Sequence, residues 1–135
     1  EYYFNGLGNR QEDQEQFYRC VHEGWETGDV DLINNLPVGR DIDKGPFTRP
    51  NPMRRYMNFR VWWEEPRNLL YLTPGLQVLY NVDDHSFSVS PDVIYTGFKD
   101  LEFRLRATAP VGDPLTEWGE KPNDYKIELR ARYYF

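Results

Sequence analysis

Five stretches of the sequence alternate between apolar and polar residues, and this period of two constrains the fold more than any other feature. The stretches cover residues 53–63, 69–82, 86–97, 101–109 and 126–135. Because successive side chains of a β-strand point to opposite sides, each stretch predicts a strand with one apolar and one polar side. Most of the stretches are longer than the strands of globular proteins, which usually have about 5 or 6 residues.

Three of the four connections between the predicted strands are short. These three read EEPR, DDH and KD, and the fourth reads PVGDPLTEWGEKPND. Strands joined in this way pair with their neighbours in the chain, so residues 52–135 predict an all-β, antiparallel up-and-down meander. Residues 1–51 differ, because a possible strand end, EYYF, is followed by an acidic, turn-rich segment that predicts one long loop. We expect a short helix near Gln11–His22 in this loop, since Phe17, Cys20 and Val21 share a helical face.

Composition excludes several classes of protein. A net charge of −6 argues against a nucleic-acid-binding domain, which carries a basic surface. The single cysteine, Cys20, excludes an intrachain disulfide and a cysteine-based zinc site. No run approaches 18 apolar residues, so the sequence predicts no membrane-spanning helix.

The apolar side of the predicted strands faces a core in a soluble barrel or sandwich, and lipid in a membrane barrel. Three features favour the membrane. The strands reach the length of about 9 to 11 residues that crosses a bilayer, and aromatic residues gather near the strand ends, as at two membrane interfaces. Pro74 and Pro91 lie within strands on the apolar side, where a soluble core strand rarely tolerates proline. The aromatic residues are Trp62, Trp63, Phe98, Tyr133, Tyr134 and Phe135 at one level and Tyr80, Phe87 and Tyr125 near the other.

The last stretch carries a resemblance to a known family. Its alternating residues are Ile127, Leu129, Ala131, Tyr133 and Phe135. This pattern resembles the C-terminal signature of Gram-negative outer-membrane β-barrels, which the barrel-assembly machinery reads as an insertion signal. The resemblance implies the bacterial outer membrane as the location. It also implies membrane lipid, lipopolysaccharide and the assembly machinery as partners, and it leaves a homo-oligomer open.

The resemblance also implies a topology with the C-terminus on the periplasmic side. KD and EEPR then become short periplasmic turns, whereas residues 110–124 and 5–51 become long extracellular loops, the second of which could instead fold into the pore. DDH would be a tight extracellular hairpin. Five strands, or six with Glu1–Phe4, are fewer than the minimum of eight, so we expect the C-terminal part of a larger barrel.

If the apolar side meets lipid, the polar side lines a lumen. Its predicted basic residues are Arg54, Arg60, Arg104, Arg106, Lys126, Arg130 and Arg132, and its acidic residues are Glu64, Asp92, Glu102 and Glu128. The difference of +3 predicts an arginine-lined channel or porin for small anionic solutes, such as acidic oligosaccharides, without cofactor or reaction. Tyr56, Tyr71 and Trp62 on the same side could stack on sugar rings. The equally open alternative is that the charges only brace neighbouring strands.

Two other kinds of function compete with the channel. One is a soluble, lipocalin-like barrel that binds an apolar ligand inside and keeps its arginines in water. The other is a membrane-barrel enzyme that uses His85 beside Asp83 and Asp84, although a polar turn explains these residues more simply.

A calcium site is the one metal site that the sequence suggests. Acidic residues recur in the N-terminal loop, at Asp29, Asp31, Asp41 and Asp43. They match no standard calcium-binding spacing, so a solvated loop is favoured and no metal site is predicted.

Overall fold

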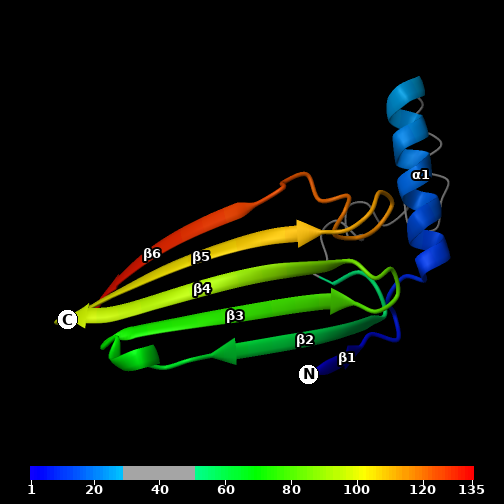
Figure 1. Cartoon of the computed structure of the whole chain (residues 1–135). Helices are drawn as coiled ribbons and strands as arrows, with labels where there is room; N and C mark the ends of the chain where they lie inside the picture. Colours follow the sequence, from blue (N-terminus) through cyan, green and yellow to red (C-terminus); the bar gives the residue numbers. More distant parts are fainter. Residues whose placement is uncertain (29–50) are drawn as a thin grey trace.

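The structure, a computed structural model, describes residues 1–28 and 51–135 and contains one six-stranded antiparallel sheet (Figure 1). The elements are β1 (Tyr2–Phe4), α1 (Gln11–Thr27), β2 (Arg55–Trp62), the 3₁₀ helix η2 (Pro66–Asn68), β3 (Leu72–Asn81), β4 (Phe87–Phe98), β5 (Leu101–Val111) and β6 (Lys126–Tyr133). Each strand pairs with the next in chain order, which confirms the predicted meander and the sixth strand at the N-terminus. The sheet is not closed into a barrel, because β1 and β6 are its two edges.

The strand boundaries differ from the predicted ones mainly at β3. This strand begins at Leu72 rather than residue 69, because the three preceding residues belong to the connection from β2. In that connection Glu65, Arg67 and Tyr71 have φ values of 47°, 50° and 66°, which are incompatible with an extended strand. The tight connections at 82–86 and 99–100 are as predicted.

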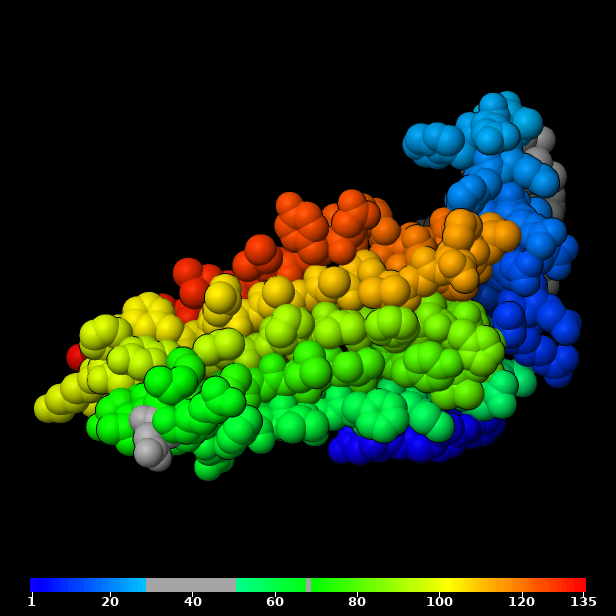
Figure 2. All heavy atoms as spheres, in the orientation of Figure 1, coloured from blue at the N-terminus to red at the C-terminus, as the bar shows by residue number. Residues whose placement is uncertain are grey.

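The helix α1 covers the expected residues and continues to Thr27, where Gly28 ends it with a φ of 72°. It stands at one end of the sheet and covers neither of its faces (Figure 1, Figure 2). Its buried Phe17 and Tyr18 form a small apolar core with Val21 and with Leu115 of the β5–β6 connection. We call this end of the sheet the helix end; it also holds the β3–β4 turn. The opposite end, with the β2–β3 and β4–β5 connections and the C-terminus, is the turn end.

The register separates two faces of the sheet, because residues paired across antiparallel strands point to the same side. On the apolar face, Val61 pairs with Leu76, Leu76 with Pro91, and Ala107 with Ile127. The polar face carries the other residue of each alternating pair. The predicted division into two faces therefore holds across the sheet.

The two faces have the reverse of the usual burial. The buried residues of the strands all lie on the polar face: Tyr56, Asn81, Ser88 and Asp92. On the apolar face no strand residue is buried, and Phe59, Val61 and Leu129 are exposed at 58%, 66% and 71%. No helix among the described residues is long and apolar enough to span a membrane.

Candidate functional site

Most of the predicted basic residues lie together on the polar face. They are Arg60 on β2, Arg104 and Arg106 on β5, and Lys126, Arg130 and Arg132 on β6. Arg54 precedes β2 and lies at the helix end, where its Nε donates to the carbonyl oxygen of Gly8 at 2.9 Å. Tyr71 lies in the β2–β3 connection and is half exposed.

Asp92 on β4 joins two of these arginines. Arg106 is its direct cross-strand partner and donates from Nη2 to Oδ2 at 2.9 Å. Arg104 donates from Nε to both carboxylate oxygens at 2.9 Å and forms a further short contact from Nη2. The Asp92 side chain is only 6% exposed. A buried carboxylate with two guanidinium partners braces neighbouring strands of the sheet, which accounts for these two arginines as structural groups.

The remaining cations of the polar face keep most of their charge accessible. Glu128 contacts Arg130 closely and Lys126 at 3.7 Å, and Glu102 lies 3.8 Å from Arg132. The side chains of Lys126, Arg130 and Arg132 remain 60–70% exposed. These contacts are therefore weak surface pairs.

Charge on the polar face of the strands is unbalanced. Six cations (Arg60, Arg104, Arg106, Lys126, Arg130 and Arg132) face three carboxylates (Asp92, Glu102 and Glu128), which leaves +3. Arg104 and Arg130 are direct cross-strand partners, an arrangement that costs energy unless nearby acids offset it. Asp92 and Glu128 supply that offset.

Trp62 and Arg60 form a second feature of the polar face, on β2. The indole of Trp62 lies over Gly75 of β3, so closely that a Cβ there would meet Trp62 Cδ1 at 2.4 Å. The guanidinium carbon of Arg60 lies 5.2 Å from the centre of this ring system, a cation–π distance. Trp62 is 45% exposed, so an aromatic surface beside a cation is accessible on the polar face.

A buried carboxylate, Glu117, ties the β5–β6 connection to the helix end of the polar face. Its Oε2 accepts hydrogen bonds from the Tyr56 hydroxyl at 2.6 Å and from Asn81 Nδ2 at 2.9 Å. The Tyr56 hydroxyl in turn accepts from the Met53 N–H at 2.8 Å. Tyr56 is completely buried in this network, so its ring offers no surface to a solute.

Two further bonds hold the same connection. Asp84 Oδ2 accepts from the Glu117 N–H at 2.7 Å, and Ser86 Oγ accepts from the Trp118 N–H at 3.3 Å. The alternating pattern did not reveal this anchor, since Glu117 lies in a turn-rich segment. One acid among turn residues is no signal by itself.

The pKa of Glu117 is raised to about 7, mainly by burial. The charge of nearby Asp84 contributes to the rise, while the hydrogen bonds from Tyr56 and Asn81 and the charge of Lys121 reduce it. The second carboxylate oxygen, Oε1, is buried without a hydrogen-bond partner among the described residues. This group therefore changes its charge near neutral pH.

Glu120 joins the same connection to α1. Its Oε2 lies 2.9 Å from His22 Nε2, and its Oε1 accepts from the Leu115 N–H at 2.8 Å. Burial, the largest influence, acts to raise the pKa of Glu120, but these bonds and the charge of His22 together hold it below its usual value.

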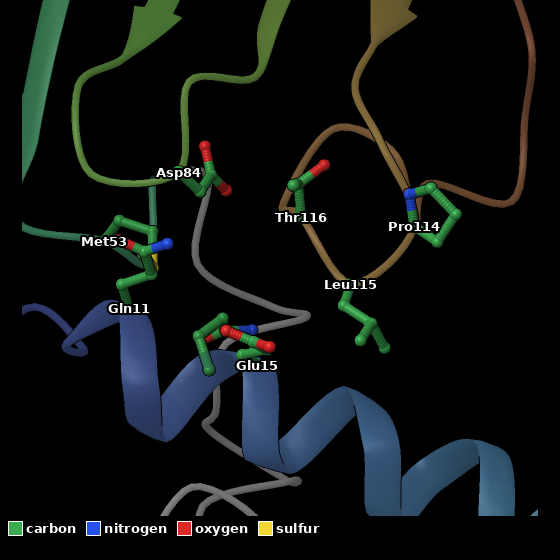
Figure 3. A pocket seen from close by; sticks show the side chains of 8 residues that line it. Gln11, Glu15, Met53, Asp84, Pro114, Leu115 and Thr116 are labelled. Atoms are coloured by element: carbon green, nitrogen blue, oxygen red, sulfur yellow. The ribbon is translucent and has the colours of Figure 1, made fainter.

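A cavity of about 170 Å³ lies between α1, the β3–β4 turn and the β5–β6 connection (Figure 3). Gln11 and Glu15 reach it from the helix, and Asp84 and Thr116 from the two connections. Gln14 also lines it, and its buried Nε2 has no partner among the described residues.

The residues of the possible enzyme site do not gather into one catalytic group. His85 Nδ1 lies 2.6 Å from the Tyr80 hydroxyl, while Asp83 binds Arg55 and Asp84 binds Ser86, so the two acids turn to other partners. The acidic residues that were considered and not favoured as calcium ligands, Asp29, Asp31, Asp41 and Asp43, lie outside the described residues. Within residues 1–28 and 51–135, no three His, Cys, Asp or Glu side chains gather as metal ligands do.

The residues of the predicted assembly signal lie at the edge of the sheet. Ile127, Leu129, Ala131 and Tyr133 occupy the apolar side of β6, and all are exposed. The strand ends at Tyr133, but the Tyr134 N–H still donates to the Asp100 carbonyl oxygen at 2.8 Å. The Phe135 ring stacks on that of Tyr133 with centroids 6.3 Å apart. No family model, no curated protein and no solved structure matches this chain.

Proposed function

We propose that this chain forms part of the wall of a β-barrel channel in the outer membrane of a Gram-negative bacterium, and that small anionic solutes pass along its polar face. The observation that carries the proposal is the reversed burial of the two faces. The polar face holds all the buried strand residues, whereas the apolar face has none: its residues are exposed on β2 and β6 and exposed or half-buried on β3, β4 and β5. Every apolar side chain exposed to water raises the free energy of the sheet, and contact with lipid removes that cost.

The dimensions of the apolar face suit a bilayer. Along β4, the aromatic residues Phe87 and Tyr95 mark the two ends of an apolar segment on this face. Eight residues at about 3.3 Å each span about 26 Å along the strand. At the tilt of about 40° that is usual for barrel strands, this is about 20 Å across the membrane, most of the apolar band of about 25 Å in membrane barrels. The unpaired edges, β1 and β6, are where further strands would complete the wall.

The polar face supplies the preference for anions. Its charge of +3 includes the accessible side chains of Lys126, Arg130 and Arg132, and low-dielectric walls strengthen the attraction of such charges for an anion. Trp62 beside Arg60 provides an aromatic surface of the kind that stacks on sugar rings. No residue on this face needs to take part in a covalent step.

The orientation of the faces is the first point to test. In a Cys20→Ser background, the substitutions Leu129→Cys and Arg130→Cys each allow a fluorescent label to be attached. The two positions are adjacent in the chain but lie on opposite faces of the sheet. After reconstitution of the full-length protein in liposomes, we expect a lipid-borne quencher to act on position 129 and aqueous iodide to act on position 130. The reverse result, or a protein that stays in solution without lipid, favours the soluble ligand-binding barrel.

Selectivity is tested by reversal potential in a planar bilayer under a KCl gradient. We expect discrete conductance steps with a reversal potential that favours Cl⁻. The double variant Arg130→Gln/Arg132→Gln should shift this potential towards K⁺, whereas Arg67→Gln, a matched change in the β2–β3 connection, should not. Steps that favour K⁺ in the unmodified protein would reduce the polar-face arginines to bracing groups.

A further inference from the structure

Three arginines gather around a second cavity at the helix end, separate from the polar face. Arg10 precedes α1, Arg54 precedes β2, and Arg55 is the first residue of β2. All three line one open cavity of about 400 Å³, together with Phe4 and the acids Glu12 and Asp83. In a chain of net charge −6, three guanidinium groups around one cavity form a local basic site.

Hydrogen bonds within the protein leave several N–H donors of these guanidinium groups without a partner among the described residues. Asp83 accepts from the N–H groups of Arg54 and Arg55 and from Arg55 Nε, at 3.2, 2.9 and 2.6 Å. Arg54 Nε donates to Gly8. Among the residues that the structure describes, the terminal guanidinium nitrogens of Arg54 and Arg55 make no hydrogen bond, and the Arg10 side chain makes none at all.

The cavity lies at the border of the apolar face. Phe4 is the cross-strand partner of Arg55, and the next pair on the same side is Tyr2 with Met57. Met57 in turn pairs with Tyr80, one of the aromatic residues at this end of the apolar band. Arg55 is two residues beyond Met57, which is about 7 Å along the strand.

That position corresponds to the lipid headgroups. The headgroup region on each side of the hydrocarbon core is about 5–7 Å thick, so Arg55 reaches it if the apolar face meets lipid. Guanidinium groups bind phosphate oxygens through paired, charge-assisted hydrogen bonds. We propose that Arg10, Arg54 and Arg55 bind the phosphate group of a membrane lipid headgroup at this border; the lipid as its source rests on the proposed membrane orientation.

The binding itself is tested with a probe that needs no bilayer. Native mass spectrometry of the full-length protein in a non-ionic detergent can measure its affinity for dihexanoyl phosphatidic acid, a short-chain lipid with a phosphate monoester. We expect Arg10→Gln to weaken binding about tenfold and Arg10→Gln/Arg55→Gln about a hundredfold, since each loses a charge-assisted contact. Arg19→Gln is the matched control on α1, because among the described residues Arg19 pairs only with Glu15, and it should bind as the unmodified protein does.

The outcomes separate this inference from the proposed function. Equal binding by all four proteins overturns the site, even if the labels at positions 129 and 130 show membrane insertion. Inorganic phosphate that binds as tightly as the lipid overturns the headgroup as the ligand. Loss of lipid binding in the Arg10 variant, together with failed insertion, would support the phosphate site and refute the membrane channel. Because the Arg10 side chain makes no bond within the described structure, its variant should fold normally.

Discussion

Raising the pH from 5 to 8 should weaken the attachment of the β5–β6 connection to the sheet, because Glu117 must then be buried as an anion. Its pKa of about 7 in the structure lies above the ordinary value of 4.5 that it takes when the connection detaches. The attached state therefore binds the proton more tightly. Its extra stability is complete below pH 4.5 and is lost as the pH rises to about 7.

The size of the effect follows from these two values. The full difference of 2.5 pKa units corresponds to about 3.4 kcal/mol, of which about 2.5 kcal/mol falls between pH 5 and 8. The equilibrium between attached and detached states should then shift about 70-fold over this range. Glu120 in the same connection does not mimic the effect, since its pKa is shifted in the opposite direction, below its ordinary value.

Hydrogen exchange of the Glu117 and Trp118 amides measures this equilibrium directly, because both N–H groups are bonded only in the attached state. After correction for the intrinsic rate at each pH, protection should fall about 70-fold from pH 5 to 8. Glu117→Gln removes the titrating group and should abolish the fall. The matched variant Glu120→Gln should retain it. Protection that stays constant or rises with pH in the unmodified protein would refute the burial argument.

Three further substitutions test other parts of the structure. Asp92→Asn leaves its two arginine partners without a carboxylate and should lower the free energy of unfolding by about 3 kcal/mol, measured by urea titration in detergent. Tyr56→Phe removes the hydroxyl that joins Met53 to the buried carboxylate and should cost about 1–3 kcal/mol in the same assay. Gly8→Ala places a Cβ 2.3 Å from the carbonyl oxygen of Met53 and should cost about 1–3 kcal/mol. Gly6→Ala, whose Cβ meets its nearest neighbour at 3.7 Å, should be nearly neutral.

The alternating sequence and the short connections were enough to predict the strands, their order and their faces. In a strand, successive side chains point to opposite sides of the sheet, so the pattern assigns each residue to one face. It also placed Arg60, Arg130 and Arg132 correctly on the polar face. Connections carry no such period. The left-handed conformation of Tyr71, which shortens β3, follows from local turn geometry that neighbouring residue types do not specify.

The anchor at Glu117 could not be predicted for a different reason. Glu117 and Tyr56 are 61 residues apart, and their bond depends on how a long connection folds back over the sheet. The burial of Tyr56 could not be predicted for the same reason. The alternating pattern puts Tyr56 on the polar face, but it does not show that the β5–β6 connection folds over that part of the face. The charges on the strands were predictable, whereas their division into braced and accessible groups required the distances to Asp92 and Glu128.

Glu117 lies far enough from Arg104 and Arg130, two central arginines of the polar face, to act independently of them in the proposed channel. Asn81, which binds Glu117, and Thr73, which shares the cross-strand row of Arg104, are eight residues apart on β3. That separation is about 26 Å along the strand, or roughly three Debye lengths at physiological salt. The charge on Glu117 therefore hardly changes the potential at Arg104 and Arg130, and Glu117→Gln should leave the reversal potential unchanged while it abolishes the pH dependence of attachment. A selectivity that follows the titration of Glu117 would instead place the selective step at the helix end and remove it from the arginines of the wall.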